Sequence, residues 1–429
     1  MRIAICDYCG HPFQVQLSRQ LAKRGHNVLH LYSTDIVGPK GAVQRLASDV
    51  NNFEIEGVTT GEPVSRLNFV KRRRQESQIG RLFARRCELF RPDIIISANM
   101  PLDAQSKLMA AARRINASFI FWLQDVISVA MEKLLSQRSF VYRPVIMLYR
   151  LREKRLLRQS DAVVAISDDF VPILKQWRIA NRRTWVIPNW APLEDIPVAQ
   201  KVNAWSRRLG LGNKRLILYA GTLGLKHNPN KLLDIAAAAA PYRDVRIVVA
   251  SEGAGAEFIS NEVKRRRLEN LSVLPFQPID EFPAMLAAAD VLVVLIEKEA
   301  GTFSVPSKLL SYLCAGRAVL LSVPKENLAA RIVEQNELGI VVDPDDNAQF
   351  VASALRLLDD EKARAQYAYA ARRYAEETFD IERIADRFEE VIASATGRSR
   401  AQGRAAPDYV AGKGRLASRA DREMSDSAA

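Results

Sequence analysis

Short apolar runs alternate with amphipathic segments along most of this 429-residue chain, and this alternation constrains the fold more than any other feature. Residues 2–7 predict a buried strand, residues 13–23 carry apolar side chains at helical spacing, and residues 28–32 form the next apolar run. A strand, a helix and a second strand in this order make the βαβ unit of a parallel sheet. The order recurs up to residue 188 and begins again at residue 215. The sequence therefore predicts an α/β fold with two Rossmann-like parallel-sheet domains.

Changes in composition predict where the parts of the chain begin and end. A stretch with two prolines and no periodicity predicts a linker over 191–199, between a first domain of residues 1–190 and a second of residues 200–378. A final helical segment at 379–396 is expected to pack back on the first domain. The tail at 397–429 is rich in Ala, Gly, Ser and Arg without periodicity, and we expect it to be disordered.

Composition and cysteine content favour a cytoplasmic protein. Hydrophobic residues make up 48% of the chain, and no apolar run reaches the roughly 18 residues of a membrane span. The N-terminus runs directly into the first strand, with no signal-peptide pattern. Cys6 and Cys9 form a Cys-x-x-Cys without the second pair of a zinc site, which predicts two reduced thiols, with a redox pair as the alternative.

Positive charge is concentrated in the first half of the chain. The net charge is +13, and residues 1–198 hold 30 Lys and Arg against 18 Asp and Glu. Residues 138–158 contain seven cations and one acid among aromatic and aliphatic side chains, and Arg72 to Arg74 form a second cluster. Such segments predict contact with an anionic membrane surface, the alternative being a solvated helix face. Nucleic acid is not an expected partner, because no recognised binding motif accompanies the charge.

Two loops of the second domain follow predicted strands, where parallel sheets bind their ligands. The first, from Ala220 to Lys226, has glycines that allow close backbone approach and a lysine that can reach a phosphate. The second holds Gly253-x-Gly255, a weak signal alone. An ordinary turn explains either loop equally well.

A third loop is more informative. Small and hydroxylated residues from Gly301 to Ser304 lead to Pro306 and a helix from Ser307, which Gly316 ends. The free N–H groups and the dipole at such a helix start favour an anion such as a diphosphate. A plain amphipathic helix would also use Pro and Gly in this way, but it would not need the small residues before the proline.

Taken in order, these segments resemble glycosyltransferase family 4, a retaining family of GT-B fold in which two Rossmann-like domains face each other across a cleft. The second-domain segments that carry the resemblance are 221–226, 253–255, 289–294 and 307–319. First-domain segments resemble the WcaI/WbuB-like subgroup of bacterial surface-polysaccharide glycosyltransferases; they are 10–17, 122–125, 165–170 and 187–190.

The resemblance implies transfer of a sugar, such as an N-acetylated amino sugar or a deoxy sugar, from a nucleotide diphosphate donor. The implied acceptor is a lipid-linked saccharide in exopolysaccharide or O-antigen synthesis. No metal and no further cofactor are expected. The enzyme would work in the cytoplasm, peripherally associated with the inner face of the plasma membrane.

The resemblance, together with the positions of the loops after the predicted strands, points to a set of candidate site residues. Lys226, Asp125 and His11 are the candidate catalytic residues, although Asp125 has a helix N-cap as its alternative role and His11 a structural hydrogen bond. The candidate donor-binding residues are Gly221, Thr222, Lys226, Gly253, Glu299, Thr302, Phe303, Ser304, Lys308 and Ser311.

Three of these positions depart from the family pattern. Phe303 and Ser311 stand where the wider family often carries two glutamates, and Thr222 stands where it carries an arginine. We therefore expect the diphosphate to rely on Lys226, Lys308 and backbone N–H groups. Two other functions stay open: a nucleotide-sugar epimerase, which shares the fold and needs no acceptor, and a non-catalytic scaffold of polysaccharide assembly, which the three departures keep open.

Overall fold

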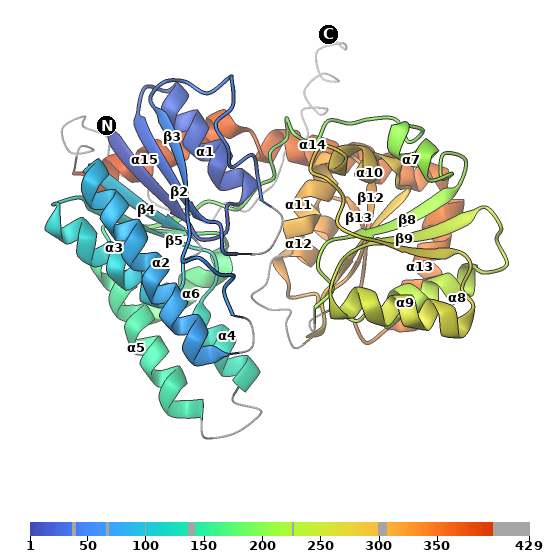
Figure 1. The fold of residues 1–429 in the computed structure, drawn as a ribbon. Coiled ribbons are helices and arrows are strands. Elements are labelled where there is room, and N and C mark those ends of the chain that lie inside the picture. The colour runs from blue at the N-terminus through green and yellow to red at the C-terminus, as the bar shows by residue number, and fades with distance from the viewer. Residues whose placement is uncertain are drawn as a thin grey trace, which may run out of the picture.

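The computed structural model contains two α/β domains joined by an extended connection (Figure 1). No helix of the described part of the chain is both long and apolar enough to cross a membrane. The predicted disordered tail lies outside the described residues apart from Gly397. The structure describes residues 1–36, 40–65, 68–98, 100–135, 142–224, 227–298 and 307–397.

The first domain is a seven-stranded sheet with helices on both faces (Figure 1). Its elements are β1 (Arg2–Asp7), α1 (Pro12–Lys23), β2 (Asn27–Ser33), β3 (Phe53–Val58), α2 (Phe69–Phe90), β4 (Ile94–Ala98), α3 (Leu102–Arg114), β5 (Ser118–Leu123), α4 (Ile127–Leu135), α5 (Arg143–Gln159), β6 (Ala162–Ala165), η2 (Asp168–Phe170), α6 (Val171–Gln176), η3 (Asn181–Arg183) and β7 (Thr184–Val186).

The second domain is built on a six-stranded sheet. Its elements are α7 (Ala204–Arg208), β8 (Arg215–Ala220), α8 (Asn230–Ala239), β9 (Val245–Ala250), α9 (Ala254–Arg266), β10 (Leu271–Leu274), α10 (Phe282–Ala288), β11 (Val291–Leu295), α11 (Ser307–Cys314), β12 (Ala318–Ser322), α12 (Leu328–Gln335), β13 (Gly339–Val342), α13 (Asn347–Asp359) and α14 (Glu361–Thr378).

Both sheets are wholly parallel and share one topology. The strand order is β3-β2-β1-β4-β5-β6-β7 in the first domain and β10-β9-β8-β11-β12-β13 in the second. Each order reverses direction once, between β1 and β4 and between β8 and β11. Open parallel sheets bind ligands outside the carboxyl ends of the strands at this reversal. The predicted fold of two Rossmann-like parallel-sheet domains is thus confirmed, and its topology marks one ligand position in each domain.

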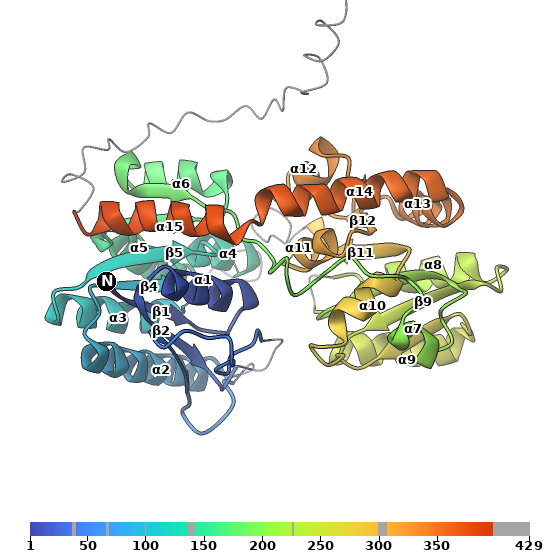
Figure 2. The ribbon, with the colours of Figure 1, turned by 90° about the horizontal axis from the view of Figure 1, so that it is seen from above.

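The last two helices connect the domains. α14 packs against α11 and β12 of the second domain, and α15 (Ile381–Ala395) lies along α1, β5 and β6 of the first (Figure 2). Arg24 of α1 donates to the carboxylates of Glu382, Asp386 and Glu389 on α15 at 2.6–2.7 Å. These ion pairs hold the end of the chain on the first domain.

Aromatic side chains fill the space between α15 and the first sheet. Phe388 of α15 meets Trp122 of β5 with ring centroids 4.7 Å apart, and Trp122 stacks on Trp190 at 5.9 Å. All three side chains are buried. Because Trp122 also borders the ligand end of the sheet, this packing fixes one wall of the site described below.

Candidate active site

In the second domain, the strand reversal brings the glycine loop after β8 against the first turn of α11. Gly221 has a φ of +127°, and a Cβ there would lie 3.3 Å from Lys308 Cε. The Lys308 ammonium lies 3.8 Å from the centre of the Tyr219 ring and contacts its hydroxyl. The missing side chain of Gly221 thus leaves room for a cation directly beside the end of the strand.

Two buried tyrosines hold this arrangement in place. The Tyr312 hydroxyl, on α11, accepts from the N–H of Ala220 at 2.9 Å and donates to its carbonyl at 3.1 Å. The Tyr219 hydroxyl donates to the Thr222 carbonyl at 2.8 Å. Burial raises the pKa of both phenols, so they remain neutral hydrogen-bonding groups. Hydrogen bonds of these two buried side chains therefore fix helix α11 and the loop to one another, and a ligand can bind without breaking them.

A second glycine loop, at the start of α9, packs against the first. A Cβ on Gly255 would lie only 2.4 Å from the Leu223 carbonyl, so the start of α9 can approach the loop only without a side chain there. Gly253 has a φ of +87°, which glycine adopts without strain. His227 Nδ1 accepts from the Gly224 N–H at 2.9 Å and closes the loop at its other end.

The structure places part of the predicted donor site and leaves part of it undescribed. Gly221, Thr222, Gly253 and Lys308 come together at the carboxyl ends of β8 and β9. Ser311 lies one helical turn after Lys308 on α11, which puts the two side chains on neighbouring positions of one helix face. Lys226, Glu299, Thr302, Phe303 and Ser304 lie outside the described residues, and their roles stay predictions.

In the first domain, His11 lies in the loop after β1 and is oriented by a buried carboxylate. Its Nδ1 is 3.2 Å from Asp7 Oδ1, and its side chain is 32% exposed. Asp7 is fully buried and also accepts the N–H of Cys9 at 2.9 Å. The structural hydrogen bond considered for His11 is thus present, and the ring keeps an exposed part that a ligand can contact.

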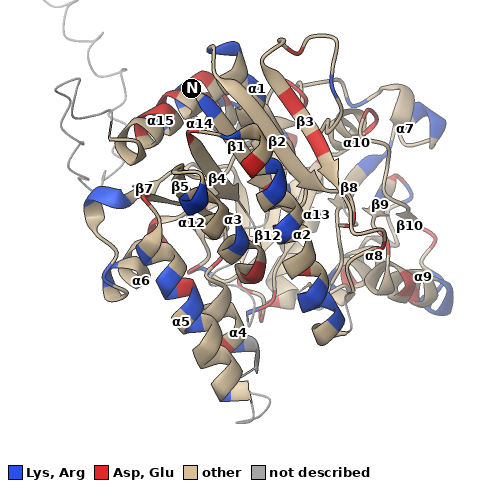
Figure 3. Cartoon of the chain, turned by 60° about the vertical axis from the view of Figure 1, so that its left-hand side comes forward, with Lys and Arg blue, Asp and Glu red and all other residues tan. Residues whose placement is uncertain are grey.

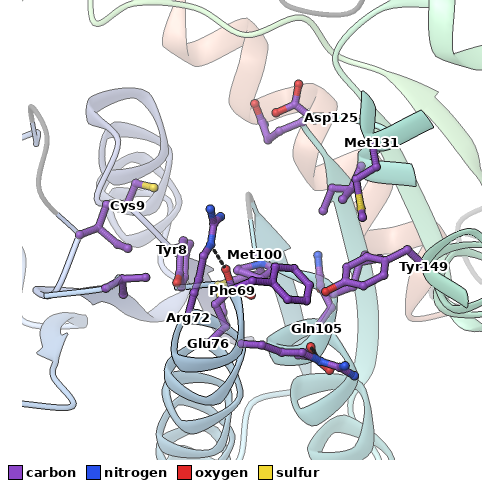
Figure 4. Close-up of a pocket in the computed structure, with 18 of the residues that line it drawn as sticks. Tyr8, Cys9, Phe69, Arg72, Glu76, Met100, Gln105, Asp125, Met131 and Tyr149 are labelled. Carbon is purple, nitrogen blue, oxygen red and sulfur yellow. Dashed lines mark hydrogen bonds and ion pairs between the residues drawn. The ribbon is translucent and has the colours of Figure 1, made fainter. Parts of the chain in front are cut away.

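Asp125 follows β5 and borders the ligand end of the first sheet (Figure 4). The alternative role of Asp125 as an N-cap of α4 stays a prediction, and a second carboxylate also lies at this helix start. Glu153 of α5 accepts the N–H groups of Ile127 and Ser128 at 2.8 and 2.9 Å. Asp125 itself is exposed at the surface of the cavity described next.

A cavity of about 620 Å³ opens at the reversal between β1 and β4 (Figure 4). Small-molecule sites typically have volumes of about 300–1,000 Å³. Seven of the segments that line it are the ends of β1 and β5, the loop after β2, the first turns of α2 and α3, and the facing sides of α4 and α5. A Cβ on Gly80 of α2 would lie 2.5 Å from Ala104 Cα on α3, so this glycine lets the two walls meet.

Charged side chains on α2 pair within that helix and with α3 at the cavity wall. Arg72 Nε donates to Glu76, one turn later on α2, at 2.7 Å (Figure 4). Arg73 Nε donates to Asp103 of α3 at 2.8 Å. Arg152 of α5 contacts the same Asp103. Burial raises the pKa of Glu76 even with Arg72 beside it.

Sequence reasoning assigned none of these lining residues except Asp125 to a site. The run Arg72 to Arg74 was predicted as part of a membrane contact, and the structure places Arg72 and Arg73 in the cavity. The position of two of these residues in the sequence indicates the site: Tyr8 and Cys9 directly follow the first strand, where parallel sheets bind ligands. Among the described residues, no group of His, Cys, Asp and Glu side chains is arranged to hold a metal ion.

Two protein-family patterns match the chain, one in each domain. The glycosyl transferase 4-like domain matches residues 11–190, and glycosyl transferases group 1 matches residues 202–374. No curated protein sequence matches the chain significantly.

Several solved structures are similar to this one over nearly the whole of both chains. Anabaena Alr3699/HepE in complex with UDP-glucose is 17% identical, with a TM-score of 0.66 over 92% of this chain and all of that one. WaaG, a glycosyltransferase involved in lipopolysaccharide biosynthesis, is 16% identical, with a TM-score of 0.65 over 90% of this chain and 98% of that one. Sucrose-phosphate synthase from Thermosynechococcus elongatus is 16% identical, with a TM-score of 0.71 over 93% of this chain and all of that one.

These matches, together with the two sheets and their paired ligand positions, define a glycosyltransferase of the GT-B type. Its first half is a glycosyl transferase 4-like domain and its second half is a glycosyl transferases group 1 domain.

Proposed function

We propose that this protein is a retaining glycosyltransferase that moves a sugar from a nucleotide diphosphate donor to a lipid-linked saccharide in the synthesis of a bacterial surface polysaccharide. The observation that carries the donor side is Lys308, held on the first turn of α11 against the glycine loop after β8. A cation and a helix start at a strand reversal suit a diphosphate. Structures similar to this one have been solved with UDP and with UDP-glucose.

The same arrangement suits the chemistry of transfer. When the bond between sugar and diphosphate breaks, negative charge builds on the leaving phosphate, and fixed donors stabilise it without rearranging. Lys308 is pre-positioned by Tyr219 and Gly221, and Lys226 is proposed as a second cation from the undescribed part of the loop. Asp125 and His11, at the ligand end of the first sheet, are proposed to orient the acceptor hydroxyl.

Replacing Lys308 tests the donor site. Lys308→Ala should weaken binding of the donor by about tenfold or more, because charge-assisted hydrogen bonds contribute roughly 1.5–3 kcal/mol. Calorimetry with UDP-, GDP- and dTDP-sugars measures binding, and mass spectrometry of a lipid extract detects transfer. Lys264→Ala, in the exposed last turn of α9, is the matched control.

Three outcomes contradict the proposal. Equal donor binding by wild type and Lys308→Ala would show that Lys308 does not contribute to the donor site. Conversion of the donor without any acceptor would favour an epimerase. A lack of donor binding by the wild type and by every variant would favour a scaffold.

The acceptor side of the proposal is supported by the surface at the lower end of the first domain, where the starts of α2 and α5 project beside α4 (Figure 1). Four apolar side chains of α5 and its N-cap residue Tyr142 are 36–55% exposed there; the four are Val145, Met147, Leu148 and Leu151. Phe69 and Val70 of α2 are 54% and 60% exposed. We call these seven residues the apolar tip.

Cations accompany the apolar tip on both helices (Figure 3). The one acid of α5, Glu153, is buried at the start of α4, so the exposed charges of this helix are all positive. Apolar side chains among cations are the pattern of helices that lie on anionic lipid. We propose that the apolar tip rests on the inner face of the plasma membrane, with the cavity mouth close to it, because Phe69 belongs to both.

A further inference from the structure

We infer that Asp169 and Arg331 form an ion pair between the two domains that biases the angle at which the donor site faces the first domain. Arg331 Nη2 lies 2.6 Å from Asp169 Oδ2, and the two side chains are 33% and 34% exposed. Neither side chain lines the cavity or belongs to the candidate donor residues, so both are positioning residues. The effect of the pair on transfer rests on the function proposed above.

The two residues follow strands that neighbour the proposed sites. Asp169 lies in η2, which comes after β6; β6 pairs with β5, and Asp125 follows β5. Arg331 lies on α12, which comes after β12, and the helix that carries Lys308, α11, leads into β12. The pair therefore connects the carboxyl end of one sheet with the carboxyl end of the other. A change at the pair should alter how the two proposed sites face each other.

The chain itself crosses between the domains at two places. The first crossing is held by the first domain where Trp190 Nε1 donates to Gln16 at 2.8 Å, and by the second domain where Arg372 donates to the Ile196 carbonyl at 3.0 Å. The second crossing is residues 379–380, between α14 and α15. Two connections leave the domains free to rotate about the line through them, and a third contact restricts that rotation. Figure 2 shows α6, which follows η2, and α12 on one side of the α14–α15 crossing.

Local hydrogen bonds hold both side chains of the pair in place. The Ser167 hydroxyl donates to Asp169 Oδ2 at 3.0 Å and accepts the Asp169 N–H at 3.1 Å. Arg331 Nη1 donates to the Glu326 carbonyl at 2.5 Å, while Nη2 donates to Asp169. Side chains that are already held in one geometry lose less entropy when they pair. A half-exposed pair of this kind favours one arrangement of the domains by up to about fivefold, which biases the angle without locking it.

The arrangement of the domains can be measured on the full chain without any ligand. Lys175 on α6 and Gln335 on α12 are exposed positions, one in each domain. Spin labels on Lys175→Cys and Gln335→Cys report the distance between the domains by pulsed electron paramagnetic resonance. Cys9→Ser removes the half-buried thiol from this background, and the other three cysteines are buried.

Arg331→Met should lower the population at the wild-type distance about twofold to fivefold relative to other distances, and high salt should have the same effect on the wild type. Arg331→Glu should lower it further, because two carboxylates then face each other. The exchanged pair, Asp169→Arg with Arg331→Asp, should restore the wild-type distance. Arg208→Glu is the matched control, since it makes the same charge change in the second domain but breaks an ion pair with Glu281 of that domain.

Donor binding and transfer are measured on the same variants. Calorimetry with UDP-, GDP- and dTDP-sugars should give the same affinity in wild type, Arg331→Glu and the exchanged pair, because the pair lies outside the donor site. Transfer to a lipid extract should fall in Arg331→Glu and recover in the exchanged pair. A pair that only stabilises the fold would instead lower the thermal midpoint and leave the distance between the domains unchanged.

Equal distance distributions in wild type and Arg331→Glu would overturn the inference, and so would a changed distance that the exchanged pair does not restore. Equal transfer by all three proteins despite a changed distance would overturn the link between the pair and transfer. A lack of donor binding by the wild type would contradict the proposed function alone, because the distance measurement needs no donor.

Discussion

At the scale of single residues, Asp7 determines the geometry of the loop after β1. Its buried carboxylate accepts from Cys9 and from His11, and the Gln14 amide nitrogen, turned toward it, lies 2.9 Å from both oxygens. Burial raises the pKa of Asp7, but the contacts with His11 and Cys9 outweigh burial and leave the pKa below its ordinary value. The charged form therefore stabilises the fold.

We expect Asp7→Asn to lower the free energy of unfolding by about 1–3 kcal/mol at neutral pH, because the amide cannot accept the same set of hydrogen bonds. A carboxyl with a lowered folded-state pKa stabilises at pH values above its unfolded pKa of about 3.9, and this stability is lost as pH falls through the folded pKa. The difference between wild type and variant should thus shrink below about pH 4.

Urea unfolding at neutral and acidic pH measures this difference. Asp345→Asn is the control, since its side chain is 70% exposed. A difference that stays constant down to the lowest pH would show that the charge of Asp7 contributes nothing.

At the scale of elements, the sequence predicted the central strands and the edge strand β10, and it did not predict the edge strands β3 and β13. β1, β4, β8 and β11 are apolar runs buried on both faces, which only a covered parallel strand explains. β3 was not predicted, because it is an edge strand whose glutamates interrupt the apolar pattern. Helix α2 was missed because its first turns bury Gln75 and Glu76 and expose arginines, so helical periodicity begins late.

Glu153 of α5 holds the start of α4 in place. Replacing it should destabilise α4, which forms part of the cavity wall. Glu153→Ala leaves the N–H groups of Ile127 and Ser128 without acceptors at the start of α4. We expect a loss of about 2–4 kcal/mol of stability, from two unpaired backbone groups. Hydrogen exchange of the α4 amides together with thermal unfolding measures it.

Glu132→Ala is the matched control, because Glu132 pairs with Arg150 in a half-exposed ion pair of about 0–1 kcal/mol. Slow exchange of the α4 amides in Glu153→Ala, as in the wild type, would show that α4 does not depend on this cap.

At the scale of the whole molecule, the glycine loops of the second domain could be predicted from sequence and the first-domain cavity could not. The glycine loops and the start of α11 are continuous segments whose glycines and lysine are visible in the sequence. The first-domain cavity is assembled from side chains that lie far apart along the chain, such as Tyr8, Glu76, Gln105 and Tyr149. Only the folded sheet, through its reversal between β1 and β4, brings them together.

The apolar tip gives the whole molecule an orientation on the membrane that can be tested. We expect the protein to float with vesicles of phosphatidylcholine and phosphatidylglycerol but not with phosphatidylcholine alone, and added salt should weaken binding. Leu148→Glu and Leu151→Glu should each reduce partitioning by about tenfold or more, because burying a leucine contributes roughly 1.5–3 kcal/mol.

The matched control lies at the opposite end of α2, where Leu89 is 65% exposed outside the apolar tip. Leu89→Glu adds the same charge to the protein and should leave binding unchanged. Equal loss in Leu89→Glu and Leu148→Glu would mean that net charge alone attracts the protein to lipid, and salt-insensitive or absent binding would contradict the membrane contact. Loss of vesicle binding in the tip variants alone would instead support contact of the apolar tip with the membrane. Because Phe69 belongs to both the tip and the cavity, the cavity mouth would then lie at the surface where a lipid-linked sugar is presented.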